Sequence, residues 1–153
     1  MGLFNFRMPK ASASSGKSGV GDTPLNAEYT PDLITTLGPD DIFVFGSNLA
    51  GHHGGGAARA ACDRFGAVWG QGEGLQGNSY AIPTMQGGVE TVRPYVDRFI
   101  AFAVSHPGKT FYVTPIGCGI AGFRAAEIAP LFRAAIGVPN IRLPHSFAIL
   151  LNI

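Results

Sequence analysis

The chain has 153 residues, the usual length of one domain with a single hydrophobic core. It is 46% hydrophobic and only 14% charged, where globular domains average about 25%, which excludes disorder, coiled coil and fibre for most of the chain. The net charge of +1 excludes a broad basic surface for nucleic acid or an anionic membrane. With 22 glycines and few charged side chains, the composition indicates that backbone groups contact a ligand.

Signals for compartment and targeting are sparse. Two cysteines, Cys62 and Cys118, are too few for a disulfide scaffold, so we predict a reducing compartment, the cytoplasm. Proline, glycine and charged residues interrupt every apolar run before it reaches the ~18 residues of a membrane-spanning helix, so we expect no membrane partner. Neither a metal ion nor a cofactor is predicted, and the sequence leaves the oligomeric state open.

Residues 1–26 are predicted to form a flexible, mildly basic extension of a domain at 27–153, because serine, glycine and proline dominate them. One stretch, Ala11 to Ser18, fits the loose phosphate-loop pattern that ends in Gly-Lys-Ser. A working phosphate loop follows a buried strand and opens a helix, whereas Pro9 precedes this stretch and two glycines and Pro24 follow it. We therefore interpret the stretch as part of the extension.

From Thr30 onward, helix and strand patterns alternate. Thr30 as N-cap and Gly38 as terminator predict a short first helix. Short apolar runs predict strands buried on both faces, and apolar residues at helical spacing predict helices. In chain order we expect a helix at 30–38, a strand at 42–45, a helix at 55–65, a strand at 79–83, a helix at 92–103, a strand at 110–116, a helix at 124–136 and a strand at 146–151. This alternation is typical of an α/β protein with helices on both faces of a mixed or parallel sheet.

Two glycine-rich loops each follow a predicted strand and open a predicted helix. The first runs from Gly46 to Ala58 and the second from Gly117 to Arg124. In an open α/β sheet, ligands bind beyond the carboxyl ends of the strands, where a helix N-terminus offers free N–H groups. Glycine lets these groups approach phosphate oxygens closely. The two loops therefore predict a diphosphate site without a lysine, and the alternative is that both are merely tight turns.

The residues of these loops resemble those of macro domains. Asn48-Leu49 followed by Gly54-Gly55-Gly56 is similar to the Asn…Gly-Gly-Gly segment of that family, and residues 117–123 are similar to its Gly-x-Gly-Ile-x-Gly-aromatic loop. Residues 69–84 resemble a compact macro-like group found in phages and bacteria. The resemblance covers roughly residues 30–150. It implies a three-layer α/β/α fold that binds ADP-ribose, as a reader or as a hydrolase of ADP-ribosylated products, and it limits nucleic-acid partners to ADP-ribosylated ones.

The resemblance also implies roles for single residues. Asn48 would contact the distal ribose, with Phe123 packed against that ribose. Asp32 would bond the adenine amino group, or else interact with the dipole of the first predicted helix. The implied ligand-binding residues are Asp32, Ser47, Asn48, Gly54, Gly55, Gly56, Gly117, Cys118, Gly119, Ile120, Ala121, Gly122 and Phe123.

Candidates for catalysis are few. Mono-ADP-ribosyl hydrolases of the family carry an Asp shortly after the glycine run, whereas residues 57–59 here are Ala-Ala-Arg. If the chain is a hydrolase, the candidates are Asn48 to position the ribose and Glu73 or His52 to transfer the proton. The alternative for His52 is a solvated loop histidine. Trp69 and Tyr80 are candidates for stacking on adenine, or else packing residues.

Two other functions remain open. Cys118 and Arg124 fit the Cys-x5-Arg loop of cysteine-dependent phosphatases, in which a helix N-terminus lowers the pKa of the thiol. That loop usually carries His before the Cys, where this chain has Gly117. The remaining hypothesis is a non-catalytic module that sequesters an NAD-derived signal.

Overall fold

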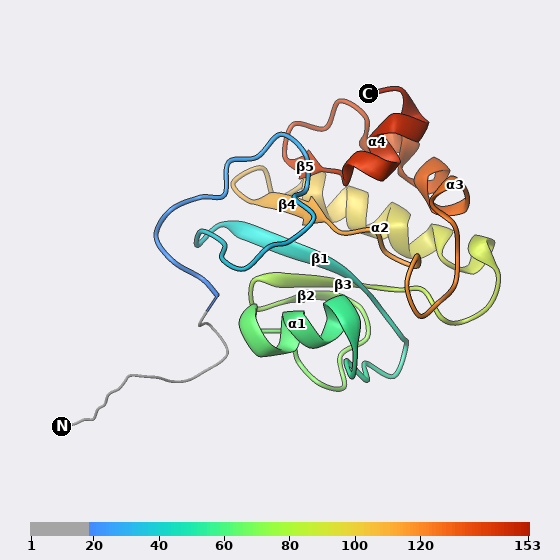
Figure 1. Ribbon diagram of the computed structural model, residues 1–153, viewed down its shortest axis with the longest axis horizontal. Helices are drawn as coiled ribbons and strands as arrows, with labels where there is room; N and C mark the ends of the chain where they lie inside the picture. The colour runs from blue at the N-terminus through green and yellow to red at the C-terminus, as the bar shows by residue number, and fades with distance from the viewer. Residues whose placement is uncertain (1–18) are drawn as a thin grey trace.

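The computed structural model describes residues 19–153, so the stretch from Ala11 to Ser18 lies outside the described residues. In chain order the elements are β1 (Asp41–Ser47), α1 (Gly56–Arg64), β2 (Gly74–Gln76), β3 (Ser79–Pro83), η1 (Val89–Thr91), α2 (Arg93–Val104), β4 (Thr110–Val113), α3 (Ala125–Ile128), η2 (Ala129–Ala135), β5 (Ile141–Arg142) and α4 (His145–Leu151). Here η denotes a 3₁₀-helix. Figure 1 shows their arrangement.

Within residues 19–153, five strands form one mixed sheet in the order β2-β3-β1-β4-β5. β1 pairs in parallel with both β3 and β4, β4 pairs in parallel with β5, and β2 pairs antiparallel with β3. Phe43 of β1 lies opposite Ser79 on one side and Tyr112 on the other. Because β1, β3 and β4 run in the same direction, their carboxyl ends meet at one edge of the sheet.

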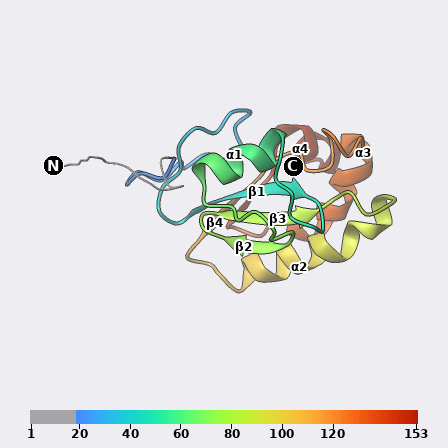
Figure 2. The same cartoon turned by 90° about the horizontal axis from the view of Figure 1, so that it is seen from below.

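The central strands are apolar at successive positions because both faces of the sheet are covered. Ile42 and Val44 of β1 face a core completed by α2, α3, η2 and α4, whereas Phe43 and Phe45 face a second core under α1. Figure 2 shows α1 and α2 on opposite sides of the sheet. The predicted α/β class is confirmed, and this layering is compatible with a three-layer α/β/α fold.

The predicted helix at 30–38 is wrong, because backbone groups of this segment form hydrogen bonds with residues far away in the sequence instead of with each other. Thr30 donates its N–H to Leu143 O at 2.9 Å, and Leu37 donates its N–H to Gly19 O at 2.7 Å. Leu37 is buried in the core under α1, while Leu33, expected on the same apolar face, is 79% exposed. The segment is thus an extended connection held at both ends.

The predicted strand at 146–151 is also wrong, since this run forms α4. Phe147, Ala148 and Leu151 are buried and Ile149 and Leu150 are exposed, which is a helical spacing. Short apolar runs do not distinguish a strand from a buried helix by composition alone.

The predicted helix at 124–136 is confirmed in its position, but most of it is a 3₁₀-helix rather than an α-helix. It consists of the one-turn helix α3 followed by the 3₁₀-helix η2. The change occurs next to Pro130, the second residue of η2, which has no N–H to donate to an α-helical hydrogen bond.

Residues 19–25, which the sequence places in the extension, contact the folded domain. Gly19 donates its N–H to Arg64 O, Gly21 donates to Leu37 O, and Leu25 donates to the Asp41 carboxylate at 2.7 Å. The same carboxylate accepts the Gly38 N–H at 2.8 Å. Across residues 19–153, no helix has the length and apolar character needed to cross a membrane.

Candidate ligand-binding site

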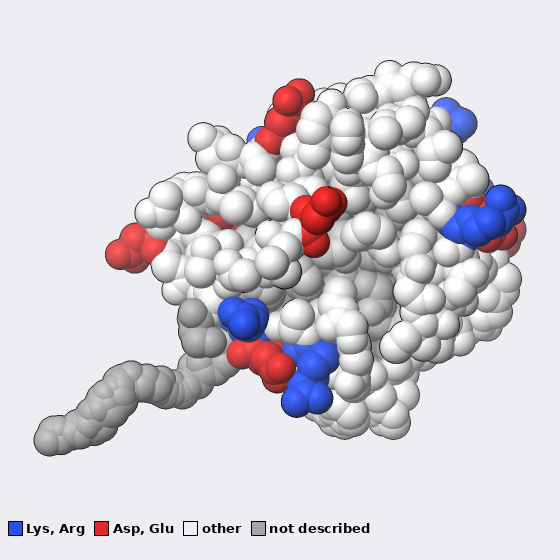
Figure 3. All heavy atoms as spheres, in the orientation of Figure 1, with Lys and Arg blue, Asp and Glu red and all other residues white. Residues whose placement is uncertain are grey.

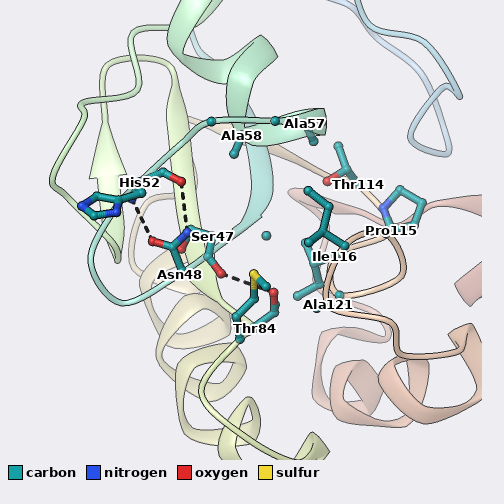
Figure 4. A pocket seen from close by; sticks show the side chains of 18 residues that line it. Ser47, Asn48, His52, Ala57, Ala58, Thr84, Thr114, Pro115, Ile116 and Ala121 are labelled. Atoms are coloured by element: carbon teal, nitrogen blue, oxygen red, sulfur yellow. Dashed lines mark hydrogen bonds between the residues drawn. The ribbon is translucent and has the colours of Figure 1, made fainter.

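A cavity of about 300 Å³ lies beyond the carboxyl ends of β1, β3 and β4. The loop after β1, the N-terminus of α1 and the loop after β4 form its walls (Figure 4). It is lined by Gly46, Ser47, Asn48, His52, Gly54, Gly55, Gly56, Ala57, Ala58, Thr84, Met85, Thr114, Pro115, Ile116, Gly117, Gly119, Ile120 and Ala121.

The topology explains why the cavity forms here. β1 and β4 are parallel neighbours, yet the chain leaves β1 toward α1 on one face and leaves β4 toward α3 and η2 on the other. Connections that diverge to opposite faces open a crevice between two adjacent strand ends, which is where open α/β sheets bind ligands. The strand order therefore places both glycine-rich loops at one cleft.

The loop after β1 is held in shape by Asn48. Its Oδ1 accepts the His52 N–H at 2.8 Å and its Nδ2 donates to His52 O at 3.0 Å. Gly51 lies between these two residues and has a φ of +71°, which residues other than glycine rarely adopt. Asn48 thus fixes the loop and remains at the cavity wall.

Unpaired backbone donors gather on the first wall. Helix α1 begins at Gly56 without a side-chain cap and without an acidic residue in its first turn. Within residues 19–153, the N–H groups of Gly54, Gly55, Gly56, Ala57 and Ala58 have no acceptor. An uncapped helix N-terminus carries partial positive charge and binds anions.

The second wall repeats this arrangement. The N–H groups of Gly119, Ile120 and Ala121 find no acceptor in the described chain either. This loop is closed by hydrogen bonds from Gly122 N–H to Gly119 O and from Phe123 N–H to Gly117 O, at 3.0 and 2.8 Å. Donors therefore line the cavity from two sides.

The two walls approach each other closely at two places. A Cβ added at Gly46 would lie 3.3 Å from Gly117 N, and one added at Gly55 would lie 3.5 Å from Ile120 Cδ1. Added Cβ atoms at Gly54 and Gly119 would meet nothing within 4 Å. These two glycines therefore leave room that the protein itself does not fill.

No Asp, Glu, Lys or Arg is present among the lining residues. Charged side chains form small groups on a largely uncharged face in Figure 3. An anion in this cavity would be held by backbone N–H groups and the α1 dipole rather than by an ion pair.

Most of the predicted binding residues meet at this cavity. Those that line it are Ser47, Asn48, His52, Gly54, Gly55, Gly56, Gly117, Gly119, Ile120 and Ala121. Those outside the lining are Asp32, Glu73, Cys118, Gly122 and Phe123. Asp32 is exposed, and Phe123 packs against the core completed by α2 and η2.

The structure does not bring Glu73 to the cavity. Its carboxylate accepts two hydrogen bonds from Arg98 of α2, at 2.8 and 3.2 Å. The Arg98 guanidinium also lies 4.6 Å from the centre of the Tyr95 ring. Glu73 therefore connects the loop before β2 to α2.

His52 lines the cavity, but its ring is not aimed into it. In Figure 4 the imidazole is directed away from Thr84, Ile116 and Ala121. The ring instead stacks on Trp69, with ring centres 5.3 Å apart and an interplanar angle of 12°. Its neighbour His53 is buried and contacts Gln71 O and Gln76 Oε1 through Nε2, so His53 supports the loop.

Cys118 and Arg124, the residues of the phosphatase hypothesis, are also poorly placed for that chemistry. Burial, followed by the charge of Glu127, raises the pKa of the Cys118 thiol above its ordinary value of 9.0. A nucleophilic thiolate requires a lowered pKa. Arg124 is exposed and directs its guanidinium to Glu127 at 3.7 Å.

Sequence reasoning missed the residues that follow β3 and β4. Thr84 donates its N–H to Ser47 O at 2.9 Å, and Thr114 donates its hydroxyl to Val44 O at 2.7 Å, so both tie neighbouring strand ends together. Met85 and Pro115 follow them in the lining. Their position directly after buried strands was the available signal, because such positions reach the carboxyl edge of a parallel sheet.

A third glycine-rich segment, residues 68–73, supports the loop after β1 and is called here the supporting loop. Gly70 donates its N–H to Gly51 O at 2.8 Å, and the Ser47 hydroxyl donates to Gly72 O. A Cβ at Gly72 would lie less than 3.0 Å from the carbonyl oxygens of Asn48 and Leu49. The two loops thus pack backbone against backbone.

No family model, curated protein or solved structure matches this chain.

Proposed function

We propose that this protein binds ADP-ribose or a related nucleotide diphosphate, with the diphosphate in the cavity between the loop after β1 and the loop after β4. The observation that supports this proposal is the set of unpaired N–H groups at residues 54–58 and 119–121, which belong to residues that line one cavity without a charged side chain. A diphosphate is the ligand chemistry that needs many donors and no carboxylate.

The expected strength is sufficient for specific binding. A hydrogen bond to a charged group contributes roughly 1.5–3 kcal/mol, so four or five such bonds hold a dinucleotide-sized ligand without a lysine. The cavity volume of about 300 Å³ is at the lower end for ligand sites, at roughly 300–1,000 Å³. The cavity therefore suits the diphosphate and an adjoining ribose, and the rest of the nucleotide extends outside it.

The proposal is one of binding rather than turnover. Hydrolysis of an ADP-ribosyl bond needs a group that transfers a proton at the ribose. Glu73 is paired with Arg98, and the His52 ring is turned toward Trp69. This placement favours a module that binds or sequesters an NAD-derived nucleotide, in keeping with the resemblance to macro domains.

Thermal unfolding with ADP-ribose, ADP, pyrophosphate and inorganic phosphate tests the proposal. A ligand at about 100 times its Kd adds about 2.7 kcal/mol to the free energy of unfolding, which raises Tm by several degrees for a domain of this size. A protein whose Tm and calorimetric titration respond to none of the diphosphates contradicts the proposal.

The Gly119→Glu variant locates the site. The added side chain enters open space at residue 119, so the fold tolerates it, but its carboxylate occupies the proposed diphosphate position. We expect ADP-ribose affinity to fall by roughly 100-fold or more, since juxtaposed like charges cost several kcal/mol. Gly108→Glu is the matched control, because Gly108 is exposed, also has nothing within 4 Å of an added Cβ, and lies outside the cavity lining. Equal affinities of the two variants would place the ligand elsewhere.

A further inference from the structure

An exposed aromatic ring lies against a residue of the cavity wall. The indole of Trp69 is 62% exposed and, among residues 19–153, is the one Phe, Tyr or Trp side chain that is largely exposed to solvent. Its ring stacks on His52, a residue that lines the cavity. Burial against the protein normally stabilises an indole, so such exposure next to a cavity-lining residue calls for an explanation.

The indole is held in place by neighbouring contacts. His52 is fixed by the two hydrogen bonds to Asn48, and Gly70, next to Trp69, donates its N–H to Gly51 O. One face of the indole is covered by the imidazole at an interplanar angle of 12°. The exposure of the remainder leaves the other face open to a planar ring.

We propose that the open face of Trp69 stacks on a planar heterocycle linked to a ribose of the nucleotide whose diphosphate lies in the cavity. This inference rests on the proposed function. His52 connects the two parts of the site, since its backbone is bracketed at the cavity wall and its ring supports the indole. Stacking on an aromatic side chain suits any base, because every base presents a π-face.

Two sources supply such a ring. One is adenine of the ADP half, and the other is a ring attached to the second ribose, such as nicotinamide in NAD. ADP and ADP-ribose carry only the first, NAD carries both, and pyrophosphate carries neither. These four ligands therefore separate binding in the cavity from stacking at Trp69, and also separate the two sources.

Trp69 is the single tryptophan of the sequence, so tryptophan fluorescence reports on this position alone. We expect ADP and ADP-ribose to quench the emission if adenine stacks there, and NAD alone to quench it if the second ring does. Pyrophosphate should bind in calorimetry without quenching. A free tryptophan amide at the same ligand concentrations corrects for absorption by the nucleotides. Nucleotides that bind in calorimetry without changing the emission overturn the inference and leave the proposed function intact.

Variants at residue 69 provide the second readout. Loss of one base–aromatic stack should weaken binding of the quenching nucleotide by roughly tenfold in Trp69→Ala, while pyrophosphate affinity stays unchanged. Trp69→Phe should restore most of the affinity, because a smaller ring still stacks. Val68→Ala is the control, since it removes a neighbouring exposed apolar side chain that is 50% exposed. Equal loss for pyrophosphate and nucleotide in Trp69→Ala, or equal loss in Val68→Ala, overturns the stacking. If no diphosphate binds even the unmodified protein, the proposed function fails instead.

Discussion

Two sets of glycines lie next to each other in this molecule and serve opposite purposes. At Gly54 and Gly119, on the cavity walls, an added Cβ would meet nothing within 4 Å. At Gly51 and Gly72, where the supporting loop meets the loop after β1, an added Cβ would overlap backbone atoms of the facing loop. The first set leaves space for something outside the chain, and the second set lets two parts of the chain touch.

Glycine content does not by itself locate a ligand site. What distinguishes the two sets is the space beyond the missing Cβ. Substitutions on the cavity walls should therefore change affinity and spare stability, whereas substitutions of the glycines at the loop contact should lower stability.

The largest effect is expected from Gly72→Ala. The new methyl group would lie less than 3.0 Å from the carbonyl oxygens of Asn48 and Leu49, and these are backbone atoms that cannot rotate away. Forced overlap of this kind costs typically 1–3 kcal/mol and sometimes more, so we expect the free energy of unfolding to fall by about 3 kcal/mol in urea titrations.

Gly54→Ala is the matched change on the cavity wall. It inserts the same methyl group into open space, so the free energy of unfolding should change by less than about 0.5 kcal/mol. Its calorimetric affinity for ADP-ribose should fall, because the methyl group keeps neighbouring N–H groups from the phosphate oxygens. Similar stability losses in the two variants would remove the distinction between the two sets.

The next effect is a pH dependence at Tyr80, whose strand neighbour Leu75 follows the supporting loop. Burial, with a further contribution from the charge of Glu73, raises the pKa of Tyr80 from 10.0 to about 12. Below pH 10 the phenol is neutral in both states. Between pH 10 and about 12 the unfolded chain ionises first, so the free energy of unfolding should fall with rising pH.

We expect a loss of roughly 1–2 kcal/mol across that window, after allowing for solvent screening. Tyr80→Phe should be less sensitive to pH there, because it removes the ionising group. Urea unfolding at pH values on both sides of 10 measures the difference, and the remaining tyrosines serve as an internal reference. A variant with the same alkaline loss as the parent would show that Tyr80 is not the group responsible.

The central strands and both cavity loops could be predicted from the sequence because short-range patterns determine them. Phe43 and Phe45 alternate with Ile42 and Val44 in one apolar run, which is typical of a strand covered on both faces. The loop at Gly54 likewise follows such a strand and opens a helix. These features need no knowledge of distant contacts.

What could not be predicted depends on long-range contacts. The segment at 30–38 has good helix signals, but pairing of Thr30 with Leu143 and of Leu37 with Gly19 overrides them. Glu73 lies in a glycine-rich loop, and such loops occur both in ligand sites and in structural turns. Only the fold shows that Glu73 is paired with Arg98 of α2. Local composition therefore identified a glycine-rich region but not which of its side chains face the cavity.

The smallest effect is expected from Glu73→Gln, which tests whether the carboxylate belongs to the site or to the scaffold. The pair with Arg98 is partly exposed, so its removal should lower the free energy of unfolding by about 0.2–1 kcal/mol, and by less at high salt. The alkaline loss assigned to Tyr80 should be smaller and should end at a lower pH in this variant, because the charge of Glu73 helps to raise the pKa of the folded state. ADP-ribose affinity should stay unchanged.

Glu90→Gln, which breaks the exposed pair with Arg93, controls for the change in net charge. A clear loss of affinity in Glu73→Gln but not in Glu90→Gln would assign Glu73 to the ligand site. The supporting loop would then contribute a side chain to binding, as well as holding the loop after β1 in place.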